Sequence, residues 1–311
     1  MNRSQKLGAN NFLIKTALLL LLLLLLPGCS TKTQYPSMTR LINANEMPKE
    51  NDAIHKMSNL SHDQLIKKAD IYLQNNNYRL AKLHYQKALG LRPHSIAASI
   101  GLSKLLIQDN SLKEATQVLE KAIEGNPGNL QALVLLGATA RQQGDLNASL
   151  TWLSKAYEQN PQDPEILTEL AITNDHIGQE RLTYAEPLYR KVVSLRPNSS
   201  AAHNNLGFNY LLQGLHQDAI KAFSKALSLA PNNDRAKNNL AAAYLLAQEP
   251  DKALRLFQDT VGLAAAYNNL GYIHMTLGDQ QQAEKAFKKA LQINPSFYVR
   301  AQHNMERLNQ N

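Results

Sequence analysis

Six prolines recur along this chain at nearly constant spacing, and this spacing constrains the fold more than any other feature. They are Pro93, Pro127, Pro161, Pro197, Pro231 and Pro295, separated by 34, 34, 36, 34 and 64 residues. The last interval equals two periods of 34 less four residues. Such a period indicates an array of helix pairs, because each repeat buries its apolar face only against its neighbours.

The residues upstream of each proline also recur in register. One repeat reads His203-x-x-Leu206-Gly207-x-x-Tyr210, Ala219-x-x-x-Phe223, Ala226 and Pro231, and the last reads Tyr267-x-x-Leu270-Gly271-x-x-His274, Ala283-x-x-x-Phe287, Ala290 and Pro295. Apolar residues three to four apart form the stripe of a first helix. Small residues let a second helix approach, and proline ends that helix. We interpret His203 and His274 as packing rings, not as ligands, because they occupy aromatic slots.

This pattern resembles the tetratricopeptide repeat, in which an aromatic-x2-Leu-Gly-x2-Tyr segment is followed by Ala-x3-Phe, Ala and Pro. The resemblance implies an all-α fold, a tetratricopeptide-repeat solenoid of about seven helix pairs over residues 61–297. Residues 298–311 would form a capping helix and tail that cover the last apolar surface. Two additional residues near Gly178–Thr183 and four missing before Ala264 are expected to divide the array.

The first 28 residues have the composition of a signal peptide and are set apart from the fold. Arg3, Lys6 and Lys15 provide a positive region, and nine consecutive leucines follow from Leu18 to Leu26. This apolar run is short for a membrane-spanning helix, which needs about 20 residues. Residues 29–60 are polar, contain two prolines and show little periodicity, so we interpret them as a flexible tether.

The segment Leu26-Pro27-Gly28-Cys29 resembles the lipobox of bacterial lipoproteins, although Pro27 departs from the small residue usual at its place. The resemblance implies that Cys29 becomes the mature N-terminus and carries diacylglycerol and an N-acyl chain. The alternative is a chance cysteine after an uncleaved signal anchor. Ser30, by resemblance to enterobacterial lipoproteins, implies transfer to the outer membrane, where the chain would face the periplasm. Cys29 is the only cysteine, so no disulfide can form within the chain.

Charge and composition argue against several classes of function. The formal net charge of +8 falls to +5 without the three cations of the signal segment, and the remaining cations are scattered among acidic residues. A nucleic-acid-binding surface would need a basic stripe. The chain has no HExxH, CxxC or P-loop motif, and its nine histidines do not cluster. We therefore expect no enzyme activity, cofactor, metal, nucleic acid or small-molecule substrate.

A candidate site for a protein partner lies in the last three repeats. Each carries a pair of asparagines on its first helix: Asn204-Asn205, Asn238-Asn239 and Asn268-Asn269. The second members, Asn205, Asn239 and Asn269, occupy equivalent positions, so their amides could form a column that binds the backbone of an extended peptide. Phe208 and Tyr272 would add apolar contacts. Alternatively, the asparagines only close local hydrogen bonds.

The stretch from Ala201 to Leu308, with the shortened junction Gln258–Leu263, is similar to the tetratricopeptide lipoprotein of the tight-adherence (Flp pilus) assembly system. The resemblance implies an outer-membrane lipoprotein that supports assembly or localisation of a secretin ring and binds the secretin or another pilus-assembly subunit. Two alternatives stay open, a type IV pilus secretin pilotin and a periplasmic adaptor for a protease or cell-wall enzyme.

Overall fold

The computed structural model describes residues 57, 59–276, 278–294 and 303–307, and these are helices joined by turns. The predicted signal peptide, the lipidation site Cys29 and most of the predicted tether lie outside the described residues. No helix in the described part of the chain is long and apolar enough to cross a membrane.

The described helices fall into two compact units that meet in sequence at His176 and Ile177. The N-terminal unit contains α3 (His62–Gln74), α4 (Tyr78–Leu91), α5 (Ile96–Gln108), α6 (Leu112–Gly125), α7 (Leu130–Gln142), α8 (Leu146–Gln159) and α9 (Pro164–Ile177), less the last residue of α9. The C-terminal unit contains α10 (Leu182–Leu195), α11 (Ser200–Gln213), α12 (His216–Leu229), α13 (Asp234–Leu246), α14 (Pro250–Val261), α15 (Leu263–Thr276) and α16 (Gln280–Ile293).

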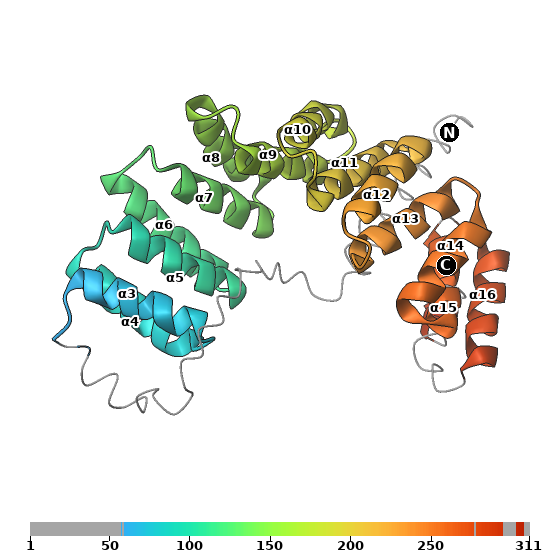
Figure 1. The fold of residues 1–311 in the computed structure, drawn as a ribbon, viewed down its shortest axis with the longest axis horizontal. Helices are drawn as coiled ribbons and strands as arrows, with labels where there is room; N and C mark the ends of the chain where they lie inside the picture. Colours follow the sequence, from blue (N-terminus) through green and yellow to red (C-terminus); the bar gives the residue numbers. More distant parts are fainter. Residues whose placement is uncertain (1–56, 58, 277, 295–302, 308–311) are drawn as a thin grey trace, which may run out of the picture. The chain divides into compact units, whose positions relative to one another are not determined.

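From α3 to α8 in the N-terminal unit, and from α11 to α16 in the C-terminal unit, successive helices pack as pairs, and each pair contacts the next. Figure 1 shows this order for α3 to α8 and for α11 to α16. In addition, first helices of neighbouring pairs contact each other, as α3 does α5, α5 does α7, and α11 does α13. The predicted all-α tetratricopeptide-repeat solenoid is thereby confirmed.

Turn and cap residues explain why the helices begin and end where they do. Ser61, Asn129, Ser199 and Asn233 precede first helices, and the side chain of each accepts a hydrogen bond from the backbone of the first turn. Between the two helices of a pair, one residue takes a positive φ: Asn76, Asn110, Gly144, Gly214, Gln248 and Gly278 do so. Gly144, Gly214 and Gly278 therefore provide left-handed turns between paired helices.

The buried residues of the core occupy the recurring positions of the sequence repeat. Tyr85, Phe223, Phe257 and Phe287 on the second helices are almost fully buried, and the small residues around them, such as Ala219 and Ala283, are inaccessible to solvent. Each large ring therefore fills space that the small residues of its own pair leave open, as the repeat pattern predicts.

Both predicted irregularities are present as changes in turn length. The turn between α9 and α10 runs from Gly178 to Arg181, whereas only Gly214 and Leu215 separate α11 from α12. The longer turn lies directly beside the boundary between the two units. At the second irregularity, Gly262 alone joins α14 to α15, with φ of 80°.

The described part of the predicted cap, residues 303–307, is helical and covers the last repeat. Asn304 is buried, and Met305 packs against the cluster formed by Ala283 and Phe287. The array thus does not end on the bare apolar surface of α15 and α16.

The packing of Gly101 against Tyr85 leads to a stability prediction. A Cβ added at Gly101 would lie 2.3 Å from Tyr85 Cζ, whereas a Cβ at Gly90 meets nothing within 4 Å. Gly101→Ala should lower the free energy of unfolding by about 1–3 kcal/mol through overpacking. It should also disturb the hydrogen bond that the Tyr85 hydroxyl donates to Asp70.

The matched control is Gly90→Ala in the preceding helix, which should raise stability by up to about 1 kcal/mol because alanine favours helix more than glycine. Urea denaturation followed by circular dichroism measures both. Equal shifts for the two variants would contradict the close contact between Gly101 and the Tyr85 ring.

Candidate functional site

The surface formed by the first helices of the pairs is the natural place for a partner. These helices are α3, α5, α7 and α9 in one unit and α11, α13 and α15 in the other. Contacts across repeats join α3 to α5, α5 to α7, and α11 to α13. Arrays of stacked repeats bind partners on the concave surface that such helices line. We call this surface the inner wall and describe it separately for each unit.

The structure places all six predicted asparagines on α11, α13 and α15 but gives them different environments. Asn204, Asn239 and Asn268 are buried, with at most 8% of each exposed. Asn205, Asn238 and Asn269 are half-buried. One asparagine of each doublet is therefore buried and the other is partly accessible, a difference that the sequence of the doublets does not indicate.

The buried asparagines form hydrogen bonds between successive repeats. Asn239 Nδ2 donates to Asn204 Oδ1 over 2.9 Å, which links α13 to α11. In the same way Asn304 Nδ2 of the cap donates to Asn268 Oδ1 of α15 over 3.0 Å. In each case the first asparagine of a repeat's doublet is the acceptor, and the donor asparagine belongs to the next repeat or to the cap. These amide pairs explain how polar side chains are accommodated between packed helices.

One amide pair of this series is missing. By the same register, Asn238 Oδ1 on α13 would accept from Asn269 on α15. Asn238 Oδ1 has no hydrogen-bond partner among the described residues, although this atom is shielded from solvent. The gap falls where Gly262 alone connects α14 to α15. The trimmed junction therefore coincides with the place in α11–α15 where the amides do not pair.

The predicted aromatic residues lie on the same helices. Phe208 on α11 and Tyr272 on α15 are both half-buried. Tyr272 packs against the clusters around Phe257 and Phe287, so part of its ring supports the fold. Whether the asparagines and these rings bind a peptide stays a prediction. The side chains of Asn204, Asn239 and Asn268 are engaged in hydrogen bonds between neighbouring elements of the array.

The N-terminal unit has a charged cluster on its inner wall that sequence reasoning did not find. Arg141 of α7 donates through Nη2 to Glu169 Oε2 of α9 over 2.7 Å, and only 15% and 21% of the two side chains are exposed. Arg141 Nε has no hydrogen-bond partner among the described residues. His176 of α9 lies nearby, and its burial lowers its pKa, with Arg141 acting in the same direction. No sequence pattern indicates this pair, because Arg141 and Glu169 belong to different repeats and meet only when those repeats are stacked.

The described residues contain no candidate metal centre. No group of three or more His, Cys, Asp or Glu could hold a metal ion there. His203 is bonded through Nε2 to the Pro197 carbonyl at 2.9 Å, and His274 Nδ1 lies 3.4 Å from Asp279, so each has a local partner.

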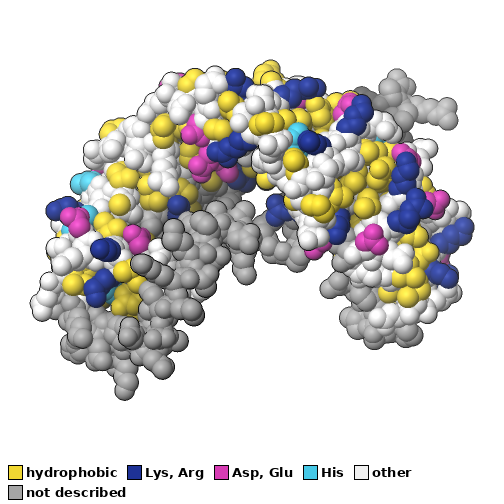
Figure 2. Space-filling view, in the orientation of Figure 1, with side chains coloured by type: hydrophobic (Ala, Val, Ile, Leu, Met, Phe, Trp, Pro, Cys, Tyr) yellow, Lys and Arg dark blue, Asp and Glu magenta, His cyan; other side chains and the backbone are white. Residues whose placement is uncertain are grey.

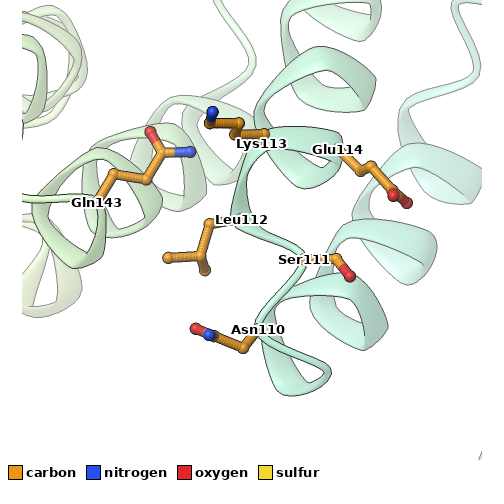
Figure 3. A pocket seen from close by; sticks show the side chains of 6 residues that line it. All are labelled: Asn110, Ser111, Leu112, Lys113, Glu114 and Gln143. Atoms are coloured by element: carbon orange, nitrogen blue, oxygen red, sulfur yellow. The ribbon is translucent and has the colours of Figure 1, made fainter.

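A surface pocket lies between the α5–α6 turn and the end of α7. Its lining consists of Asn110, Ser111, Leu112, Lys113, Glu114 and Gln143. In Figure 3, Leu112 and Gln143 face each other across the space, while Glu114 points away from it. Gln143 Nε2 donates to Thr116 Oγ1 over 3.2 Å. The pocket thus lies at the junction between two neighbouring repeats.

Comparison with known proteins agrees with this description. Models of the tetratricopeptide repeat match residues 72–121, 106–172, 198–264 and 264–297. The chain belongs to the tetratricopeptide repeat family, whose members bind protein partners and whose fold is typical of non-enzymatic scaffolds. A comparison with curated proteins finds no match.

Solved structures support the fold. A tetratricopeptide repeat protein from Parabacteroides merdae has 18% identity and a TM-score of 0.61, over 80% of this chain and 99% of that one. A thermophilic TPR protein from Thermus thermophilus also has 18% identity, with a TM-score of 0.50, over 60% of this chain and all of that one. At this identity the likeness concerns the fold alone.

The Asn204–Asn239 bond predicts a specific pattern of stabilities. Asn204→Ala leaves the buried Asn239 amide without its acceptor and should lower the free energy of unfolding by about 1–3 kcal/mol. Asn239→Ala should cost a similar amount. The double variant should cost clearly less than the sum, because removing both partners leaves no unpaired group.

Asn205→Ala on the same helix is the matched control and should change stability little, since Asn205 is half-buried and has no such bond. Thermal and urea unfolding of the two single variants, the double variant and the control gives the coupling energy between Asn204 and Asn239. Additive costs would mean that the amide pair does not hold α11 and α13 together.

Proposed function

We propose that this protein is a lipid-anchored scaffold of the outer membrane that faces the periplasm and binds protein partners during assembly of a tight-adherence (Flp) pilus. Its partner would be the secretin or another assembly subunit. The observation that carries the proposal is the lipobox-like segment ending in Cys29, placed ahead of a tetratricopeptide array.

The anchor has a simple physical role in this proposal. Diacylglycerol and an N-acyl chain on Cys29 would give durable attachment, since each buried methylene contributes about 0.8 kcal/mol and one chain alone binds weakly. Residues 30–60 would then tether the repeats to the membrane. Confinement of scaffold and secretin to one surface raises their effective concentration without any new contact.

The repeats supply the binding surface. Both units present first helices along an inner wall, and the chain has neither a catalytic motif in its sequence nor a candidate metal cluster among its described residues. A scaffold needs no more than this surface and its anchor. The role is therefore binding and placement, and we expect no enzyme activity, resident cofactor or metal.

The anchor is tested by two neighbouring substitutions. Cys29→Ser should abolish lipid attachment, measured by mass spectrometry of the mature chain, and should release the protein from membranes. Secretin multimers should then decrease in the outer-membrane fraction. Ser30→Asp keeps the lipidated cysteine and, by the sorting rule of enterobacterial lipoproteins, should retain the protein at the inner membrane with the same effect on the secretin.

The wild-type chain restored in the Cys29→Ser strain is the control and should return secretin multimers to the outer membrane. Normal assembly and localisation of the secretin in the Cys29→Ser strain would contradict the proposal. Loss of a periplasmic protease or cell-wall enzyme from the membrane, with an intact secretin, would identify the protein as an adaptor for that enzyme.

A further inference from the structure

The net charge of the N-terminal unit changes sign along the chain. Residues 61–95, which contain α3 and α4, hold six Lys and Arg residues against two Asp residues, a net charge of +4. Residues 96–176, the remainder of this unit, hold five Lys and Arg residues against ten Asp and Glu residues, a net charge of −5. The helix pair that follows the predicted tether is therefore basic, whereas the helices beyond it are acidic.

Helix α4 contributes cations to this pair without any acidic residue. It contains Arg79, Lys82 and Lys87 and neither Asp nor Glu. It packs against α3 and α5, and its remaining surface faces solvent. Arg79 and Lys87 are exposed there, and Lys82 is half-buried. A surface of one sign of charge attracts a partner of the opposite sign.

The acidic groups near α4 leave this surface positive. Both aspartates of the pair belong to α3, where Asp63 Oδ1 lies 2.7 Å from His62 Nδ1 and Asp70 accepts a hydrogen bond from the Tyr85 hydroxyl. From the next repeat, Asp109 lies 3.9 Å from Lys82, so one cation of α4 has an acidic neighbour. The exposed cations at both ends of the helix still point to an anionic partner.

Two apolar side chains are exposed at the ends of the same helix. Tyr78 is its first residue and is 42% exposed, and Leu91 is its last and is 52% exposed. Tyrosine is frequent at membrane–water interfaces, because its ring is apolar and its hydroxyl is polar. A helix that combines basic side chains with exposed apolar ones is suited to the surface of an anionic bilayer.

Another gathering of Lys and Arg is more nearly balanced by acidic residues. Figure 2 shows it along the edge formed by α14 and α16. Lys252 forms an ion pair with Glu249, and Lys288 Nζ lies 2.6 Å from Glu284 Oε1. Helix α14 holds two Lys or Arg residues and two Asp residues, so its formal charge is zero. The cations of α4 are therefore the stronger candidate for an anionic surface.

The position of this pair in the chain places it near the proposed anchor. Ser61, the N-cap of α3, follows Cys29 by 32 residues. A flexible segment of this length has an end-to-end distance of about 30 Å. Each Lys or Arg close to an anionic membrane strengthens binding about fivefold, but only within a Debye length of about 8 Å. The tether makes such a weak contact effective, because it keeps the helix close to the surface.

From these observations, we propose that α4 lies on the membrane beside the anchor and binds the head groups of anionic phospholipids through Arg79, Lys82 and Lys87. Tyr78 and Leu91 contact the lipid interface. The acidic remainder of the N-terminal unit is repelled by the same surface and stays accessible to a protein partner. This inference rests on the proposed anchor at Cys29 and goes beyond it, because the anchor alone does not orient the repeats.

The test uses the mature, lipidated full chain in vesicles, with a fluorescent label on one added cysteine. Lipid blocks the thiol of Cys29, so Gln86→Cys on the exposed side of α4 gives a single labelling site. Ser154→Cys is the matched control, because it occupies the equivalent exposed position on α8. In vesicles of about 30% phosphatidylglycerol in phosphatidylcholine, a nitroxide on the lipid head group should quench the label at position 86 at least about twofold more than at position 154. The difference should vanish in pure phosphatidylcholine and in 0.5 M NaCl, where charges are screened.

Two sets of substitutions test the role of the cations. Arg79→Gln, Lys82→Gln and Lys87→Gln together should weaken the contact at least about tenfold and remove the excess quenching at position 86. Lys113→Gln, Lys121→Gln and Lys155→Gln, on exposed positions of α6 and α8, remove the same total charge and should leave the quenching intact. Equal effects of the two sets would mean that net charge, and not the surface of α4, determines the contact.

Flotation of the vesicles separates this inference from the proposed anchor. A chain that floats with the vesicles but is quenched equally at positions 86 and 154 would overturn the inference and leave the anchor in place. Excess quenching that persists in pure phosphatidylcholine would overturn the role of anionic lipid. A photoreactive residue at position 86 that crosslinks a protein in place of lipid would overturn the inference in favour of a protein partner. A mature chain that fails to float would overturn the anchor and, with it, this inference.

Discussion

Burial of each helix pair against the next is the interaction on which the rest of this structure depends. A single pair exposes apolar surface on both sides, and the chain has no disulfide within it to stabilise such a unit. The buried rings of Tyr85, Phe223, Phe257 and Phe287 and the small residues that face them provide this contact. The described part of the cap continues it by placing Met305 over the last repeat.

Because stacking is achieved mainly by apolar contacts, polar residues between repeats are free to specify how neighbouring pairs are aligned. The amide pairs Asn204–Asn239 and Asn268–Asn304 do this in the C-terminal unit. Where the junction is trimmed to Gly262, the corresponding pair is absent, and Asn238 Oδ1 has no partner among the described residues. The change in loop length and the unpaired amide are thus two aspects of one local departure from the repeat.

The repeat pattern was sufficient to predict the helix pairs and the buried slots, because these depend on residues within one period. It also located both irregular turns. The division of the asparagines into bonded and unbonded members could not be predicted, because Asn204 and Asn239 are 35 residues apart and meet only when α11 and α13 are stacked. The Arg141–Glu169 pair was missed for the same reason, whereas Cys29 and residues 30–56 lie outside the described residues and their roles stay predictions.

The central claim is that a protein partner binds the inner wall and not the outer helices. Site-specific photocrosslinking in living cells tests it most directly. A photoreactive phenylalanine at Phe208 on α11 is compared with one at Tyr184 on α10, where 60% of the native side chain is exposed. The account predicts a crosslinked adduct with a partner protein from position 208 and none from position 184. An adduct from position 184 alone would contradict it.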